Sequence, residues 1–316
     1  MHTSSSAADR GQTTKVLMAF AAVYVIWGST YLGIRFAVET IPPFLMAGAR
    51  FAIAGAVLYA WLRMRGAPPP TRRQWRETAI VGALLIGAGN GAVSWAEQTV
   101  PSGLTALIIA LTPLWFVAIE WRRDAVRPTR EVVLGLVLGL VGMVVLIDPA
   151  RLANSGHVDP MGTVAIVGGT IAWAAGSMYS RTAELPARPL LGTAMQMFTG
   201  GLLLLVLSPL SGELATFHPA EISDTSLIAL VYLIVFGSLI AFTSYIWLLK
   251  AASPARVATY AYVNPVIAVF LGWLLADELL NGRIAIAAAI IVAGVAMITA
   301  GKSHQGTRPA TPTAPE

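Results

Sequence analysis

Apolar segments of about 20 residues recur along the whole of this 316-residue chain. An α-helix rises 1.5 Å per residue, so about 20 residues cross the roughly 30 Å hydrocarbon core of a bilayer. In hydrocarbon every backbone N–H and C=O needs an internal partner, and these uninterrupted runs lack the alternation of barrel strands. Only 12% of the residues are charged, about half the fraction of soluble proteins. The sequence therefore predicts an all-α membrane protein.

Ten transmembrane helices are predicted from these segments. They cover Val16–Phe36, Pro43–Leu62, Thr78–Ala96, Ser102–Trp121, Glu131–Pro149, Met161–Arg181, Pro189–Pro209, Ser226–Leu248, Ala255–Ala276 and Arg283–Ala300. The polar ends, residues 1–15 and 301–316, are predicted to be disordered tails.

The basic residues are distributed unequally between the two sides of the predicted membrane domain. Seventeen of the 21 Lys and Arg residues fall on the side that holds both ends of the chain, three fall on the other side, and Arg50 lies within a span. Because cytoplasmic loops carry the excess of Lys and Arg, both termini are expected in the cytoplasm. This distribution accounts for the net charge of +5 without a nucleic-acid partner, and the lipid bilayer is the expected surrounding.

The second half of the chain repeats features of the first in the same order. Pro43 and Gly55 match Pro189 and Gly201; Gly28 and Tyr31 match Gly176 and Tyr179; Trp95, Trp121 and Gly142 match Trp247, Trp273 and Gly294. Five helices per unit is an odd number, so the second unit enters the membrane from the opposite face. We therefore expect two inverted five-helix repeats, residues 16–150 and 160–300, around a central cavity that holds the substrate site.

Several function classes lack their residues in this sequence. No cysteine is present, so disulfides and thiolate chemistry are excluded. There is no phosphate-binding loop for ATP hydrolysis and no metalloprotease motif, and all four His residues lie outside the spans. No catalytic residue, cofactor or metal is therefore expected, and the chain is not expected to be an enzyme. A secondary carrier is favoured, with a passive facilitator or channel as the alternative and an intramembrane enzyme as a remote one.

Five short motifs together make the chain resemble a known family. They are Trp27-Gly-Ser-Thr-Tyr-Leu-Gly-Ile-Arg35, Ala47-Gly-Ala-Arg-Phe51, Gly89-Asn-Gly91, Val100-Pro-Ser-Gly103 and Tyr260-Ala-Tyr-Val-Asn-Pro265. They resemble the drug/metabolite transporter superfamily, its EamA-domain carriers and, most of all, the YedA-type inner-membrane exporters. The resemblance implies a multi-pass protein of the bacterial inner membrane. It also implies secondary export of amino acids, metabolites or drug-like organic molecules.

Arg50 is the strongest candidate for a substrate contact. A charge seven residues inside a span is costly, so it should face a cavity or a partner. Its guanidinium suits planar oxyanions, which predicts an anchor for a substrate carboxylate or carbonyl. A clamp onto backbone carbonyls of another helix is the alternative. Gln196 is its counterpart in the second repeat and is predicted to be a neutral substrate contact.

Polar and aromatic residues on three other spans complete the predicted substrate site. They are Trp27, Tyr31, Asn90, Tyr260 and Asn264. Trp27 and Tyr260 are predicted to stack on or gate the substrate, and Asn90 to line the cavity. Ordinary helix packing is the alternative for each.

Two prolines are predicted to be hinges. Pro113 and Pro265 occupy equivalent places in the fourth and ninth spans, and each frees the carbonyl four residues earlier, at Ile109 and Ala261. Such breaks are tolerated where they line a cavity, although a permanent kink would also fit.

Two rows of small residues could join protomers into a homodimer or could pack internally. The fifth span carries Gly135 and Gly139, and the tenth carries Ala285, Ala289 and Ala293.

Overall fold

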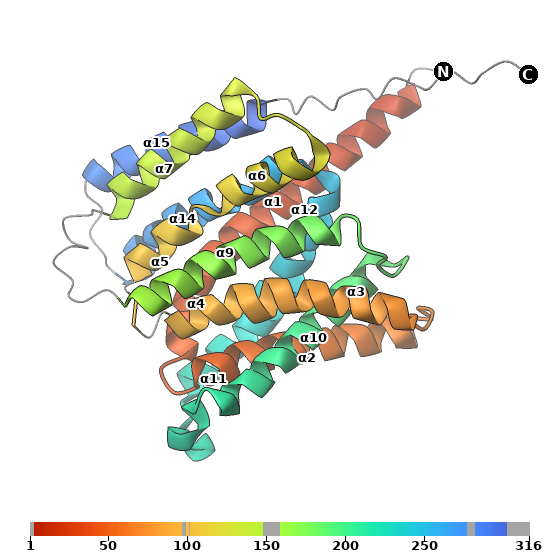
Figure 1. Cartoon of the computed structure of the whole chain (residues 1–316), viewed down its shortest axis with the longest axis vertical. Coiled ribbons are helices and arrows are strands. Elements are labelled where there is room, and N and C mark those ends of the chain that lie inside the picture. Colours follow the sequence, from red (N-terminus) through yellow and green to blue (C-terminus); the bar gives the residue numbers. More distant parts are fainter. Residues whose placement is uncertain (1–2, 97–98, 101, 148–158, 277–281, 302–316) are drawn as a thin grey trace, which may run out of the picture.

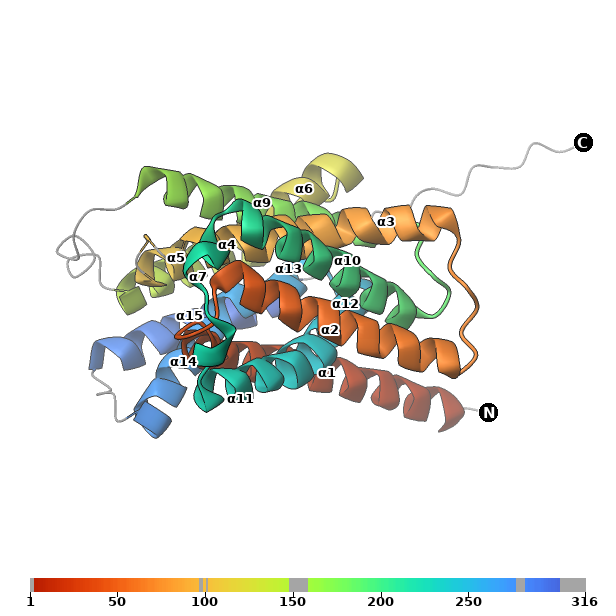
Figure 2. The same ribbon diagram turned by 90° about the horizontal axis from the view of Figure 1, so that it is seen from below.

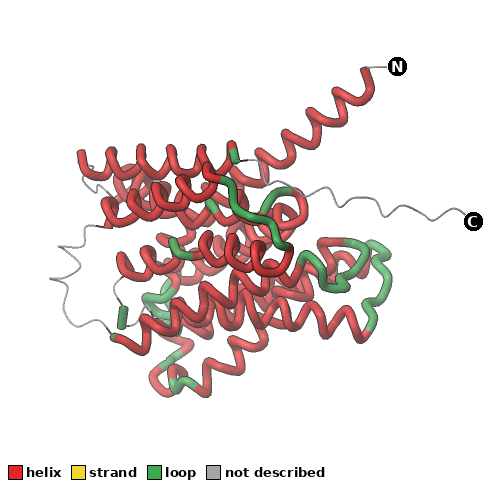
Figure 3. Tube along the Cα trace, turned by 45° about the horizontal axis from the view of Figure 1, so that its top comes forward, coloured by secondary structure: helices red, strands yellow, loops and turns green. Residues whose placement is uncertain are grey.

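The computed structural model describes residues 3–96, 99–100, 102–147, 159–276 and 282–301, and every regular element among them is a helix (Figure 3). Nine of the described helices are long and apolar enough to cross a membrane. The predicted ninth span coincides with two consecutive helices that are described up to Ala276. The all-α membrane architecture predicted from the sequence is confirmed.

The helices follow the predicted spans in order. The first half contains α1 (Thr3–Ala37), α2 (Pro43–Met64), α3 (Arg72–Gly82), η1 (Ala83–Asn90), α4 (Gly91–Ala96), α5 (Ser102–Ile109), α6 (Thr112–Asp124) and α7 (Arg130–Ile147). The second half contains α9 (Pro160–Ser180), α10 (Pro189–Leu210), η2 (Glu213–Thr216), η3 (Pro219–Glu221), α11 (Asp224–Tyr232), η4 (Leu233–Phe242), α12 (Thr243–Ala251), α13 (Pro254–Ala258), α14 (Tyr260–Ala276) and α15 (Gly282–Ala300).

The first helix is longer than expected. It begins at Thr3 instead of Val16, so most of the stretch predicted as a disordered N-terminal tail is helical. No proline interrupts this stretch, and a helix adds residues easily once its first turns exist. The predicted C-terminal tail, from residue 302 onward, lies outside the described residues.

The helix packing is symmetric between the two halves. The pair α2 and α10 packs together, as does the pair α7 and α15, which lies beside the rest of the bundle (Figure 1). In the same way α1 packs on η4 and α14, while α9 packs on η1 and α6. Exchanging the halves exchanges these contacts, as expected of two inverted repeats.

The two ends of the bundle differ in the connections that they carry. The N-terminus, the α2–α3 connection and the α9–α10 connection lie at the same end (Figure 2). We call this end the N-terminal face. α2 therefore begins at the opposite face and runs toward the N-terminal face, whereas α10 runs away from it.

Glycines allow close backbone contact between α7 and α15. A Cβ atom on Gly135 would lie 2.6 Å from the carbonyl oxygen of Gly294, and one on Gly294 would lie 2.9 Å from the backbone nitrogen of Gly139. Gly135 and Gly139 thus pack inside the protein. Ala285, Ala289 and Ala293 are exposed on α15.

Two π-helical segments occupy equivalent places in the third and eighth spans. η1 and η4 both interrupt a long α-helix at mid-span, where the hydrogen-bond register widens by one residue. Such segments often occur at functional sites.

Glu213, in the connection after α10, caps the first turn of α2. Its carboxylate accepts hydrogen bonds from the backbone nitrogens of Phe44 (3.1 Å) and Leu45 (2.7 Å) and from the Ser208 hydroxyl (2.6 Å). We expect Glu213→Gln to destabilise the folded protein by about 1 kcal/mol. The carboxylate accepts hydrogen bonds from the free N–H groups of the first turn, and its negative charge interacts favourably with the positive end of the helix dipole. Thermal unfolding in detergent measures this. Glu221→Gln, in an exposed pair with His218, is the matched control and should leave the melting temperature unchanged.

Candidate functional site

A partly enclosed cavity of about 140 Å³ lies between the two halves. Six of the seven predicted substrate contacts line it, namely Trp27, Tyr31, Arg50, Asn90, Tyr260 and Asn264. Other lining residues include Thr30, Phe51, Thr112, Thr170, Trp173 and Phe242. Both π-helical segments contribute, through Gly89 and Asn90 of η1 and Phe242 of η4. The cavity volume is similar to the roughly 150 Å³ of an engineered cavity that binds benzene, so it suits a small molecule.

Arg50 is the charged residue of this cavity. It is 5% exposed, its Nε donates a hydrogen bond to the Ser238 hydroxyl at 2.9 Å, and its guanidinium carbon lies 4.6 Å from the ring centroid of Phe51. None of the described residues that line the cavity is Asp or Glu. The guanidinium therefore gives the cavity an uncompensated positive charge.

A glycine of η4 allows the Arg50 guanidinium to lie close to the η4 backbone. A Cβ atom on Gly237 would lie 2.7 Å from the Nη2 atom of Arg50, so a larger residue here would displace the guanidinium from its present position. The carbonyl of the same glycine accepts a hydrogen bond from Trp27 Nε1 at 3.1 Å. Gly237 and Ser238 thus fix two of the predicted substrate contacts. The sequence motifs did not single out Ser238, although a hydroxyl within an apolar span is a usable signal.

We expect Ser238→Ala to weaken transport without unfolding the protein. The substitution leaves the Nε donor of Arg50 without its partner, a change of about 1 kcal/mol, which corresponds to about a fivefold rise in half-saturation concentration. Ser238→Thr keeps the hydroxyl and should restore most of the affinity. Equal transport by the alanine and threonine variants would contradict a role in positioning Arg50.

Four aromatic rings pack together at the base of the cavity. The ring centroid of Trp27 lies 5.0 Å from Tyr245, 5.2 Å from Tyr260 and 5.8 Å from Trp173. Tyr245 is fully buried beneath the cavity, and its hydroxyl accepts from Trp173 Nε1 at 2.7 Å. Trp27 and Tyr260 belong to this aromatic cluster and also line the cavity, so a bound molecule would contact them.

Two asparagines supply neutral polar groups. Asn264 is 3% exposed, and its Oδ1 has no hydrogen-bond partner among the described residues. The Asn90 amide reaches the Leu85 carbonyl at 3.5 Å, a long contact. Both amides can therefore hydrogen-bond a ligand.

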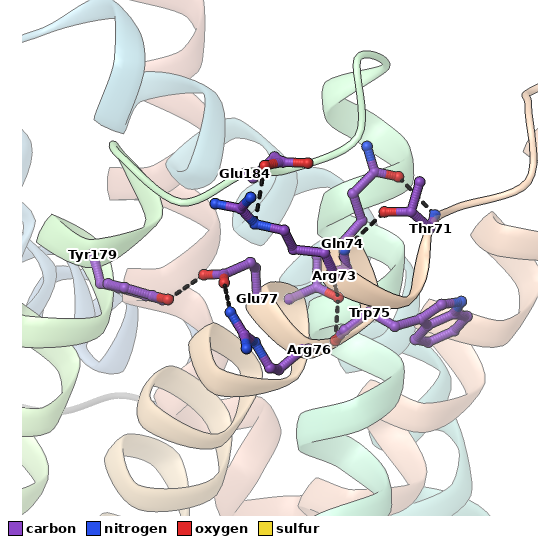
Figure 4. Close-up of polar contacts among 9 residues, drawn as sticks. Thr71, Arg73, Gln74, Trp75, Arg76, Glu77, Tyr179 and Glu184 are labelled. Atoms are coloured by element: carbon purple, nitrogen blue, oxygen red, sulfur yellow. Dashed lines mark hydrogen bonds and ion pairs between the residues drawn. The ribbon is translucent and has the colours of Figure 1, made fainter.

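Polar contacts between the halves close the bundle on the N-terminal side of the cavity. Tyr24 and Thr259, from different halves, share a hydrogen bond of 2.5 Å, and within the second half the hydroxyls of Ser177 and Tyr245 are 2.6 Å apart. Nearer the N-terminal face the Tyr179 hydroxyl donates to Glu77, which also pairs with Arg76 (Figure 4). The residues that line the cavity include Ile34, near the end of α1, and Val93 of α4, which places the cavity nearer the opposite face.

Gln196 does not reach this cavity. It is fully buried and is not among the lining residues. The inverted orientation of the repeats explains why Gln196 lies outside the cavity. Two equivalent residues of inverted repeats lie toward opposite faces of the membrane, so the counterpart of Arg50 lies nearer the N-terminal face.

The two prolines differ in their effect on the helices. Pro113 is the second residue of α6, directly after the break that follows α5, and the Thr112 hydroxyl donates to the freed carbonyl of Ile109 at 2.6 Å. Pro265 lies inside α14, and the interruption of the ninth span falls at Thr259 instead. The two spans are therefore both broken, but only the first break coincides with its proline.

Comparison with known proteins agrees with this architecture. The model of the EamA-like transporter family matches residues 14–147 and again 160–300. The chain is 39% identical over 285 residues to YedA of Escherichia coli K12, described as an uncharacterized inner membrane transporter, with 90% of each chain covered. It is 28% identical to the protein PecM of Dickeya dadantii, covering 81% of this chain and 83% of that protein. A solved crystal structure, 24% identical, superposes with a TM-score of 0.75 over 91% of this chain and 96% of the other, which supports the fold.

Proposed function

Because this chain belongs to the EamA-like transporter family of the drug/metabolite transporter superfamily, we propose that it is a secondary carrier that exports small amphipathic metabolites, such as amino acids, by alternating access. Family and relatives favour a membrane transporter over an enzyme. The distribution of Lys and Arg supports an orientation with both termini in the cytoplasm. The N-terminal face would then be the cytoplasmic face.

The observation that carries this proposal is the unpaired charge of Arg50 in a small, otherwise apolar and amide-lined cavity. A carboxylate or carbonyl of the substrate would complete the donors of the guanidinium, while Trp27 and Tyr260 would cover an apolar part. An amide oxygen such as that of Asn264 would accept from an ammonium group. A molecule of amino-acid size meets these requirements better than a large dye.

Closure on one side favours a carrier over a channel. The hydrogen bonds between Tyr24 and Thr259 and between Tyr179 and Glu77 join the two halves on the N-terminal side of the cavity. A carrier alternates between two such half-open states, whereas a channel needs a path that is open at both ends.

Counterflow in proteoliposomes tests the proposal. Vesicles containing the purified protein are loaded with one unlabelled amino acid at a time and diluted into a trace of the same labelled compound. A carrier gives transient, saturable accumulation that depends on the internal compound. Resistance of an exporter-deficient host to toxic amino-acid analogues gives an independent readout. Flux proportional to concentration without stimulation by internal substrate would indicate a channel, and no accumulation of any amino acid would reject this substrate class.

A further inference from the structure

Gln196 is a buried amide that the site described above does not explain. The residue is 0% exposed, and neither Nε2 nor Oε1 has a hydrogen-bond partner among the described residues. An amide in this position has lost its contacts with water and gained none in return, which is unfavourable. A second conformation in which the amide meets water or a ligand would explain its presence.

The repeat places Gln196 opposite Arg50 across the symmetry axis. Both α2 and α10 begin with a proline and span 22 residues, and Arg50 and Gln196 each lie seven residues after that proline. A Cβ on Gly55 would meet the backbone of Phe198, and one on Gly201 would meet the backbone of Ala52.

These contacts show that α2 and α10 are antiparallel and that the two helices cross near Ala54 and Gly200. Arg50 therefore lies four residues from the crossing, toward the face opposite the N-terminal face. Gln196 lies four residues from it toward the N-terminal face, and each is displaced by about 6 Å along its helix.

The surroundings of the two residues differ: a cavity lies beside Arg50, whereas helices pack tightly beside Gln196. Alternating access predicts this difference between an open and a closed side. Next to Arg50 the cavity separates parts of α1, α2 and η4. Next to Gln196 the helices are in backbone contact, since a Cβ on Gly82 would lie 2.5 Å from the Gln196 carbonyl and one on Gly200 would lie 2.6 Å from the Gly82 carbonyl. The Glu77–Tyr179 hydrogen bond holds α3 to α9 on the same side (Figure 4). Tyr179 is itself the repeat counterpart of Tyr31, a residue of the open cavity.

We propose that Gln196 is the polar contact of a second half of the binding site, which is closed in this conformation and opens toward the N-terminal face when the Arg50 side closes. Its amide can donate to a carboxylate or carbonyl and accept from an ammonium group, so it suits the same small amphipathic molecule as Arg50. The inference rests on the proposed alternating access. The proposal assigns Gln196 a role in the conformation that is open toward the N-terminal face, which this structure does not show.

The absence of native cysteine allows a direct test by labelling. Gln196→Cys is treated with a membrane-impermeant maleimide in intact cells and in inside-out vesicles. We expect labelling only from the N-terminal face, and faster labelling when Glu77→Gln and Tyr179→Phe remove the contact that holds α3 to α9. Met195→Cys is the matched control, since Met195 is also fully buried and packs with Leu62 and Leu191. It should stay unlabelled from both faces.

Transport kinetics provide the second measurement, which does not depend on the cysteine variant folding. We expect Gln196→Ala to raise the half-saturation concentration at least threefold for an amino acid supplied at the N-terminal face, with a smaller change from the opposite face. Wild-type counterflow without labelling of Gln196→Cys, or an unchanged half-saturation concentration for Gln196→Ala, would overturn the inference and leave the carrier function standing. Absence of wild-type counterflow would instead reject the proposed function.

Discussion

Replacing Arg50 with Ala is expected to lower amino-acid counterflow about 10- to 100-fold while the protein still reaches the membrane. A hydrogen bond to a charged group contributes about 1.5–3 kcal/mol, and about 1.4 kcal/mol corresponds to a tenfold change in affinity. Arg50 supplies the charge of the cavity, and the described lining residues contain no other Arg or Lys. Initial rates over a range of substrate concentrations measure the loss.

Two further variants separate binding from structure. Arg50→Lys keeps the charge but loses the planar fork and its bond to Ser238, so we expect an intermediate loss. Arg188→Ala is the control for removal of a cation, because Arg188 lies at the N-terminal face, where its Nη1 donates to the Arg65 carbonyl at 3.3 Å. Counterflow by Arg50→Ala equal to that of the wild type would remove this residue from the site and favour the helix-clamp interpretation.

Gly201→Leu is expected to have the largest effect on folding. A Cβ on Gly201 would collide with the backbone nitrogen of Ala52 and would lie 2.9 Å from its Cα and from the Gly48 carbonyl. These are backbone atoms, which cannot rotate away, so α2 and α10 would have to separate and lose contacts along their length. We expect a loss of several kcal/mol of stability, seen as little monodisperse protein in detergent.

Gly168→Leu is the matched control for this substitution. Gly168 is exposed on α9, and no atom lies within 4 Å of a Cβ built there. The variant should elute and melt like the wild type. If Gly201→Leu did the same, the close approach of α2 and α10 would be wrong.

The sequence predicts the course of the chain well because the bilayer imposes strong constraints. Helix lengths follow from membrane thickness, and the order of matched Pro, Gly and Trp residues shows the repeat. It also finds most of the cavity, since a charge such as Arg50 has few tolerable places in a span. The pairing of Arg50 with Ser238 joins residues 188 positions apart and has no local signal.

Other features depend on packing and escape sequence analysis. No residue type specifies the π-helical segments η1 and η4, which arise where tertiary contacts stabilise a wider register. The break in the ninth span falls at Thr259, whose hydroxyl bonds the Arg256 carbonyl and Tyr24, instead of at Pro265. The sequence predicts Gln196 in the same cavity as Arg50, because similarity between repeats gives an equivalent position without giving the face toward which it lies.

The pairing of α7 with α15 has a consequence for biosynthesis. These helices join residues 130–147 to residues 282–300, so the glycines of α7 meet their partner only after nearly the whole chain has been made. Until then Gly135 lacks the backbone of Gly294 against which it packs, which a helix can tolerate because its own backbone is satisfied internally. Formation of this helix pair is therefore a late event that follows insertion of the last helix, and a chain truncated before Gly282 would lack the partner of α7.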